Sequence, residues 1–233
     1  MITSLEAGGA ERVLSGLANS WAREGRDVTL ITLHHGRADF YELHPRVHRV
    51  ALAVLRPSSG VVQALTGNLR RLVALRRSIR RSKPELVLAF TDQTNVLTLL
   101  ATRGSGVPVV VSERTDPEAS GLGRPWVWAR RLAYQWATRV IVQTESVRRW
   151  CEAFLRPTQV VVIPNAVVDV NHEDAKLPPV PTLPPQKLVA GMGSLVPNKG
   201  FALLIQVFAG LAAEFPDWDL AILGEGPERR RLE

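Results

Sequence analysis

Two glycines, Gly8 and Gly9, directly precede a strongly amphipathic stretch near the start of the chain. From Ala10 to Trp21 the apolar residues recur at the three- and four-residue spacing of a helix with one buried face. A glycine turn that opens a helix lets a ligand approach the backbone and directs free N–H groups at an anion. We therefore predict an anion-binding turn at Gly8 and Gly9, with a turn that is merely tight as the alternative.

Two further groups of candidate residues follow other apolar runs. Lys199 and Gly200 precede the helical stretch "FALLIQVFAGLAAEF". A lysine charge beside the partial positive charge of a helix N-terminus would suit a diphosphate. The segment "SERTDP" places Glu113, Arg114 and Asp116 after the run "VPVVV". These three residues are too highly charged to be buried without partners, so we expect them to line a ligand site.

The elements that must position these residues alternate between short apolar runs and helical patterns. The expected strands are "MITSL", "DVTLITL", "VHRVAL", "ELVLAF", "VPVVVS", "RVIVQT" and "QVVVIPN". Runs of this length between helices indicate a parallel sheet covered on both faces, which is a doubly wound α/β domain. In one of the helices Thr94 is a candidate N-cap, and Gly104 follows the C-terminus. Ligands of such sheets bind beyond the carboxyl ends of the strands, where the three groups lie.

A change of composition divides the chain. Residues 1–170 form the expected Rossmann-like domain, and residues 171–186 contain five prolines and read as a linker. The pattern of strand, turn and helix then restarts over residues 187–233. Two strands with one full helix cannot close a doubly wound sheet, so we expect the incomplete beginning of a second domain. The alternative is an appendage that docks on the first domain. Ligand loops from two such domains would face a shared cleft.

The bulk composition predicts a soluble, cytoplasmic protein. Apolar runs stay well short of the roughly 20 residues that span a bilayer, and the N-terminus lacks a signal-peptide pattern. The single cysteine, Cys151, excludes an internal disulfide framework. The five histidines are scattered, which gives no metal-ligand cluster.

The formal net charge of +7 is concentrated in two segments. "NLRRLVALRRSIRRSKPE" and "GRPWVWARRLAYQWATR" combine arginines with an apolar face. Such a helix either lies on an anionic membrane surface or faces the core and keeps its arginines in solvent. The sequence shows none of the usual nucleic-acid-binding signatures, so we expect no nucleic-acid partner.

Several segments carry a family resemblance. They are "GGAERVLSGLANSWAREGRDVTLITL", "VVVSERTDP", "VIVQTESV", "VIPNAV" and "GMGSLVPNKGFALLIQVFAGLAAEFPDWDLAILGEGPERRRLE". In order along nearly the whole chain, they resemble a family 4 retaining glycosyltransferase of the GT-B fold. Among family members, the segments "SERTDP" and "QTE" most resemble those of bacterial enzymes that build lipid-linked glycans, capsule or exopolysaccharide.

This resemblance implies transfer of a hexosyl group from a UDP- or GDP-sugar to a glycan or polyprenyl-linked acceptor, with retention and without metal or cofactor. Stabilisation of the leaving group and alignment of the substrates would drive catalysis. The implied catalytic residues are Glu113, Arg114 and Asp116, facing the sugar or the acceptor. The implied donor-binding residues are Gly8, Gly9, Ser194, Lys199, Gly200, Gly224 and Glu225. The arginine-rich helices, for their part, suggest a membrane-borne acceptor reached from the inner face of the plasma membrane.

Two features depart from the family pattern. Ser194 stands where many members have an arginine that helps to bind the diphosphate. The family's E-x7-E motif, which holds the donor, has no counterpart within the 233 residues. We therefore expect a fragment with little or no activity alone. A non-catalytic nucleotide- or lipid-binding module is the alternative. A dinucleotide-dependent oxidoreductase is disfavoured because G-x-G-x-x-G is missing.

Overall fold

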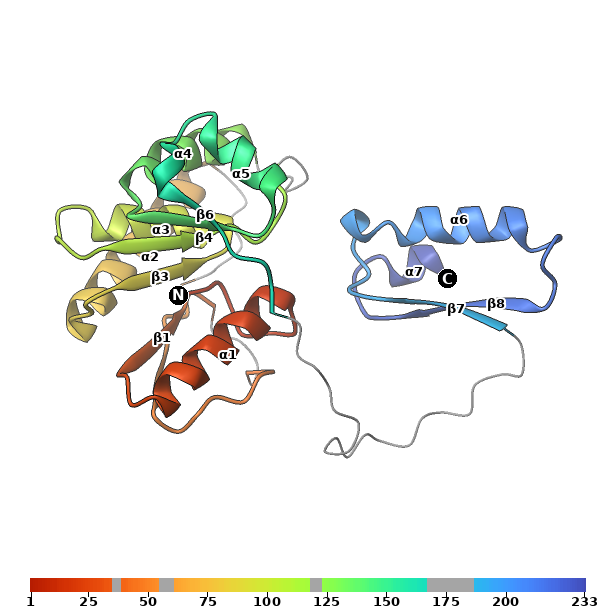
Figure 1. Ribbon diagram of the computed structural model, residues 1–233, viewed down its shortest axis with the longest axis horizontal. Helices are drawn as coiled ribbons and strands as arrows, with labels where there is room; N and C mark the ends of the chain where they lie inside the picture. The colour runs from red at the N-terminus through yellow and green to blue at the C-terminus, as the bar shows by residue number, and fades with distance from the viewer. Residues whose placement is uncertain (35–38, 55–60, 118–122, 167–186) are drawn as a thin grey trace. The chain divides into compact units, whose positions relative to one another are not determined.

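The computed structural model describes residues 1–34, 39–54, 61–117, 123–166 and 187–233 (Figure 1). Contacts between Cα atoms divide the chain into two compact units, Met1–Val167 and Val168–Glu233. The proline-rich segment 171–186 lies outside the described residues.

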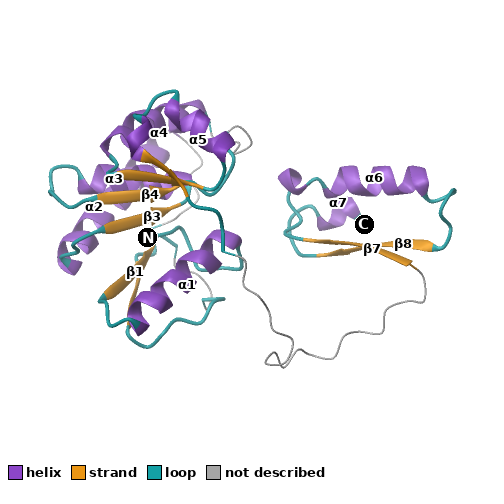
Figure 2. Ribbon diagram, viewed as in Figure 1, coloured by secondary structure: helices purple, strands orange, loops and turns teal. Residues whose placement is uncertain are grey.

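The first unit is built on short parallel strands (Figure 2). They are β1 (Val28–Thr32), β2 (Val47–Ala51), β3 (Val87–Phe90), β4 (Val109–Ser112), β5 (Arg139–Val142) and β6 (Val160–Val162). The expected strand "MITSL" is reduced to a single parallel bridge between Ile2 and Thr32. It still joins two sheets, because the Ile2 amide donates to the Ile31 carbonyl at 3.2 Å and the Phe90 amide to the Met1 carbonyl at 2.8 Å. The first residues therefore lie centrally, between β1 and β3.

In the described part of this unit, five helices accompany these strands. They are α1 (Gly9–Arg23), α2 (Val61–Ser82), α3 (Asp92–Thr102), α4 (Arg124–Ala133) and α5 (Glu145–Glu152), with short 3-10 turns η1 (Tyr134–Trp136) and η2 (Pro157–Gln159). Neighbouring strand residues point to opposite faces of a sheet. Leu30 and Phe90 belong to the apolar cluster under α1, whereas Ile31 and Ala89 belong to the larger cluster under the other helices. Both faces are thus covered at β1 and β3, as the doubly wound prediction requires, whereas Val161 of β6 is 37% exposed.

Most helix ends follow the expected local signals. Gly25 and Gly104 take positive φ angles just beyond the ends of α1 and α3. The Thr144 hydroxyl caps α5 by accepting from the Val147 amide at 3.3 Å. One prediction is wrong: α3 begins after Thr91, not Thr94. Thr94 is buried in the first turn, and its hydroxyl contacts that of Thr3.

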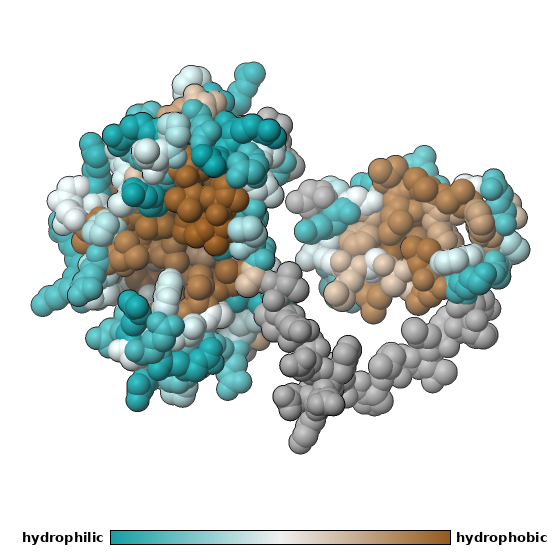
Figure 3. All heavy atoms as spheres, in the orientation of Figure 1, coloured by the Kyte–Doolittle hydropathy of each residue, from teal (hydrophilic) through white to brown (hydrophobic). Residues whose placement is uncertain are grey.

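The second unit has a single layer of helix over two strands. It contains β7 (Lys187–Met192), the 3-10 turn η3 (Pro197–Lys199), α6 (Phe201–Leu211), β8 (Trp218–Leu223) and α7 (Arg229–Leu232). β7 and β8 pair in parallel. Leu195 and Phe201 are its buried apolar residues, and hydrophobic side chains cover much of its visible face in Figure 3.

Candidate functional site

Arg114 ties together three loops at the carboxyl ends of the strands of the first unit. Its guanidinium lies 4.3 Å from the centre of the Phe90 ring, at the end of β3. Its Nη1 donates to Asn165 Oδ1 at 2.6 Å, in the segment after β6. Half-burial lowers the pKa of Arg114, and its Nε is buried without a hydrogen-bond partner among the described residues. The side chain is therefore held at the edge where ligands of such sheets bind.

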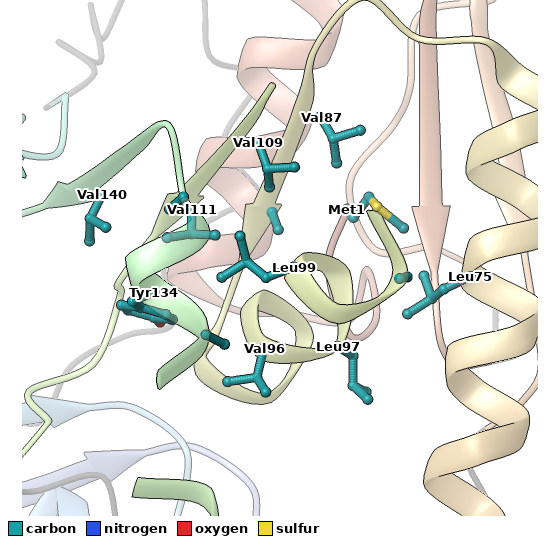
Figure 4. Close-up of a cluster of buried hydrophobic side chains, with 14 of the residues drawn as sticks. Met1, Leu75, Val87, Val96, Leu97, Leu99, Val109, Val111, Tyr134 and Val140 are labelled. Carbon is teal, nitrogen blue, oxygen red and sulfur yellow. The ribbon is translucent and has the colours of Figure 1, made fainter. Parts of the chain in front are cut away.

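Glu113 points into the protein. Its side chain has no exposed area, and Oε2 accepts from the Tyr134 hydroxyl at 2.7 Å and from Arg130 Nη1 at 3.4 Å. Burial raises the pKa of this carboxyl group to about 7, against the opposite pull of Arg130 and Tyr134. Figure 4 shows Tyr134 within the buried cluster that also contains Val111 and Val140.

A buried polar network continues from Glu113. Asn95 Nδ2 donates to the Tyr134 hydroxyl and to the Ser112 carbonyl, both at 3.0 Å. The network thus joins α3, α4, η1 and the end of β4. The expectation that Glu113 faces a substrate directly does not fit this burial, which favours positioning of the loop from beneath. Asp116, three residues on, is exposed.

Gly8 forms the N-cap of α1, as the glycine turn predicted. Its amide and carbonyl both contact the Tyr41 hydroxyl, at 3.3 and 2.9 Å. The Glu11 carboxylate lies against this turn. A Cβ at position 8 would be only 2.2 Å from Glu11 Oε2, so glycine leaves room for the carboxylate. Gly9 is exposed and has open space around it. An acidic group therefore already occupies part of this N-terminus, and anion binding at the two glycines stays a prediction.

A group of hydroxyls at the same edge was missed in the sequence. The side chains of Thr3, Thr91 and Thr94 lie within 3.0–3.3 Å of one another. Thr91 has φ +70°, which is rare for a β-branched residue and marks local strain. The run of apolar residues before Thr91 placed it at the end of a strand, but nothing in the pattern signalled its backbone angle.

In the second unit, the loops after β7 and β8 lie side by side. The Leu195 amide donates to the Glu225 carbonyl at 2.9 Å, and the Gly193 amide to the Leu223 carbonyl at 3.0 Å. Ser194 is therefore brought beside Gly224 and Glu225.

The charged and glycine residues of these loops are largely accessible. Lys199 is exposed in η3, and Gly200 follows at φ +73° as the N-cap of α6. The exposed Glu225 carboxylate pairs with Arg229. Gly8 and Gly9 belong to the first unit, and the other five expected donor-binding residues belong to the second unit.

Gly224→Ala should destabilise the second unit by about 1–3 kcal/mol, because the new Cβ would lie 1.9 Å from the Gly193 carbonyl oxygen. Gly210→Ala is the matched control: it lies in α6 with nothing within 4 Å and should be neutral or slightly stabilising. Hydrogen exchange of the β7 and β8 amides measures both. Equal protection in the two variants would contradict the close approach of these loops.

Within the described ranges, no group of three or more histidine, cysteine, aspartate or glutamate side chains is placed to hold a metal ion. None of the helices within those ranges is long and apolar enough to cross a membrane.

The comparisons with known proteins agree with one another. A transferase from Campylobacter jejuni, named as a GalNAc-alpha-(1->4)-GalNAc-alpha-(1->3)-diNAcBac-PP-undecaprenol alpha-1,4-N-acetyl-D-galactosaminyltransferase, is 27% identical over 100% of this chain and 62% of its own length. An uncharacterized glycosyltransferase from Haemophilus influenzae is 26% identical over 97% of the chain and 61% of its own length. This chain therefore spans less than two thirds of either relative.

A solved structure supports the fold. Alr3699/HepE of Anabaena, in complex with UDP and glucose, matches 99% of this chain with a TM-score of 0.68, at 16% identity and over 61% of its own length. This likeness confirms the expected α/β architecture of the GT-B type. The sequence profile of the glycosyl transferase 4-like domain matches residues 8–166, more than half of the chain. The chain thus belongs to the glycosyl transferase 4-like family.

Proposed function

We propose that this chain is the acceptor-side domain, residues 1–170, and a donor-binding segment, residues 187–233, of a retaining glycosyltransferase. The enzyme transfers a hexosyl group from a UDP- or GDP-sugar to a glycan or lipid-linked acceptor in the synthesis of a bacterial surface glycan. The family match over residues 8–166 carries the proposal. The alignment of the whole chain with a transferase whose name contains an undecaprenol-linked glycan supports it. The place of action would be the cytoplasm, at the inner face of the plasma membrane.

The donor diphosphate would be held by Lys199 together with the Gly200 N-terminus of α6. The nucleotide would lie beside Gly224 and Glu225, and Ser194 would offer a hydroxyl where many relatives carry a charge. These groups stabilise negative charge as it develops on the leaving diphosphate, which lowers the barrier without a metal.

On the acceptor side, Arg114 and Asp116 would contact the sugar or acceptor, with the Gly8–Gly9 turn nearby. Arg114 is suited to this role because Phe90 and Asn165 fix its guanidinium in one place. A fixed cation positions an anionic or hydroxylated substrate at a lower entropic cost than a mobile one. Glu113 would act from beneath, as a positioning residue.

Thermal melting of the chain with a panel of UDP- and GDP-sugars tests the donor assignment. A ligand at a hundredfold excess over its Kd stabilises the folded state by about 2.7 kcal/mol, so one nucleotide class should raise the melting temperature. Lys199→Ala should reduce this shift.

Lys187→Ala is the matched control, because Lys187 lies at the start of β7 and pairs with Asp217 at 2.8 Å. It should leave the nucleotide-dependent shift intact. A cooperative melt that no nucleotide sugar moves would contradict the assignment of Ser194, Lys199 and Gly224 to the donor site.

A further inference from the structure

Phe40 is an aromatic side chain presented to solvent at the edge where ligands of the first unit should bind. It is 66% exposed. Its amide donates to the Leu5 carbonyl at 2.9 Å, in the loop that leads from the Ile2 bridge to α1. His34, just beyond β1, is bound to the same loop, because its amide donates to the Thr3 carbonyl at 2.9 Å. Phe40 therefore lies beside the carboxyl ends of the strands, where open parallel sheets bind their ligands.

The segment that carries Phe40 is fixed by both of its neighbours. The Asp39 carboxylate accepts from Arg49 of β2 in two hydrogen bonds, of 2.8 and 3.0 Å. The Tyr41 ring lies against that of Phe40, with centres 5.0 Å apart and planes 77° apart. The Tyr41 hydroxyl is bound in turn to the amide and the carbonyl of Gly8. Single exposed apolar side chains are ordinary, but this one is held in position, so a ligand that packs on it orders little further side chain.

Two carboxylates border the same loop. Glu6 lies in it, and its Oε1 is 3.7 Å from His34 Nδ1. The Glu11 carboxylate lies against Gly8, at the start of α1. Burial is the main cause that raises the pKa of Glu11, and the charge of Glu6 raises it further, although a backbone hydrogen bond opposes both. The two carboxylates therefore act on one region of the surface.

The chemistry of this region suits a neutral ligand that carries hydroxyls. An ionised carboxylate only accepts hydrogen bonds, and so does a fully ionised phosphate. A phosphate would therefore find no donor in Glu6 or Glu11, and their charge would repel it. A sugar hydroxyl, in contrast, donates to a carboxylate in a charge-assisted hydrogen bond.

The exposed ring supplies the other half of such a site. A pyranose has faces made largely of C–H groups, whose hydrogens carry a small positive charge. They pack favourably on the face of an aromatic ring, where the quadrupole is negative. Phe40 with Glu6 and Glu11 therefore offers an apolar contact and hydrogen-bond acceptors to one sugar ring.

We propose that Phe40 is the platform for an uncharged terminal sugar of the acceptor. The C–H face of the sugar packs on the ring, and Glu6 and Glu11 accept hydrogen bonds from its hydroxyls. The open space around Gly9 leaves room for a sugar ring at this turn. The inference rests on the proposed function, because it names the acceptor group that residues 1–170 recognise. It also gives the turn at the two glycines a use other than phosphate binding.

Saturation-transfer NMR with methyl glycosides tests the platform on the 233-residue chain. The neutral probes are the methyl glycosides of glucose, galactose, N-acetylglucosamine and N-acetylgalactosamine, and the methyl glycoside of glucuronic acid is the charged comparison. At least one neutral glycoside should bind, and the glucuronide should bind more weakly. Phe40→Ala should raise the Kd of the neutral glycoside roughly tenfold, whereas Phe40→Trp should retain binding. The matched control is Phe215→Ala, which removes a 48% exposed ring from the second unit and should leave the Kd unchanged.

Glu6→Gln tests the hydroxyl contacts separately. Glutamine still accepts a hydrogen bond but without the charge that strengthens it, so the Kd should rise roughly threefold. Glu24→Gln is the control for this variant, because Glu24 is an exposed carboxylate just beyond the other end of α1.

Thermal melting of each variant separates loss of binding from loss of folding. Three results would overturn the platform: no binding of any neutral glycoside, tighter binding of the glucuronide, or equal binding by Phe40→Ala and the unmodified chain. If a nucleotide sugar still raised the melting temperature in such a case, the proposed function would stand without this assignment. Glycoside binding that depends on Phe40, in a chain that no nucleotide sugar stabilises, would support the platform and count against the donor assignment.

Discussion

Replacing Tyr134 with alanine is expected to lower the free energy of unfolding of the first unit by about 3–5 kcal/mol. The ring is fully buried, in the cluster that includes Val111 and Val140. Its hydroxyl accepts from Asn95 at 3.0 Å and donates to Glu113 at 2.7 Å. Alanine would therefore leave a cavity and also two polar side chains with one partner fewer.

Tyr134→Phe separates the two contributions. Phenylalanine keeps the ring and removes only the hydroxyl, so the expected loss is about 1–3 kcal/mol. Urea unfolding followed by circular dichroism and tryptophan fluorescence measures both variants. A loss as large as that of alanine would show that the hydrogen bonds, and not packing, dominate at this position. Losses below 1 kcal/mol in both would contradict the burial of Tyr134.

The alternation of strands and helices could be predicted because short apolar runs and glycine stops are local signals in the sequence. Runs such as "VLAF" and "VVVS" are too short for buried helices, and glycines beyond α1 and α3 stop those helices where positive φ angles are needed. The predicted strand "MITSL" forms only one bridge. Its few residues are held by hydrogen bonds to strands that are distant in sequence, which no local pattern contains.

The inward direction of the Glu113 side chain was not predicted from the sequence. The charged residues of "SERTDP" were expected to line a ligand site. The two-residue alternation of β4 contained a contrary signal, because Glu113 continues the buried side of Val109 and Val111. Whether that side remains covered beyond the strand depends on Arg130 and Tyr134. These partners approach only after α4 has folded back on the sheet, so the sequence alone did not reveal them.

Two glycines of the second unit are required by close packing, which the sequence did not indicate. Gly224 was assigned to the nucleotide side by resemblance alone. The structure supplies a packing reason for glycine there, because any Cβ would collide with the Gly193 carbonyl. Gly226 is equally constrained, with a Cβ only 2.4 Å from the Leu195 carbonyl oxygen. A packing role and a ligand role are compatible, since close backbone approach also leaves the loop edge open to a ligand.

Burial of Glu113 also sets the pH dependence of stability. The pKa of its carboxyl group rises from 4.5 to about 7 in the folded state. Burial is the largest cause, and nearby Asp92 adds to it, while Arg130 and Tyr134 oppose it. Because the folded state binds this proton more tightly than the unfolded state, its contribution to stability is fully present below about pH 4.5. That contribution is lost as the pH rises through 7, and it amounts to about 3 kcal/mol.

Glu113→Gln isolates this effect, because glutamine does not titrate and its carbonyl oxygen still accepts from Tyr134. We expect the free energy of unfolding of the unmodified chain, minus that of the variant, to fall by about 3 kcal/mol between pH 4.5 and pH 8. Urea unfolding at each pH measures the difference, and Glu145→Gln controls for the removal of an exposed carboxylate. A difference that instead rises with pH would mean that Arg130, at 3.4 Å, holds the carboxylate ionised in the fold. Glu113 would then be one half of a buried ion pair, and its neutralisation would leave Arg130 as an uncompensated charge beneath the loop that carries Arg114.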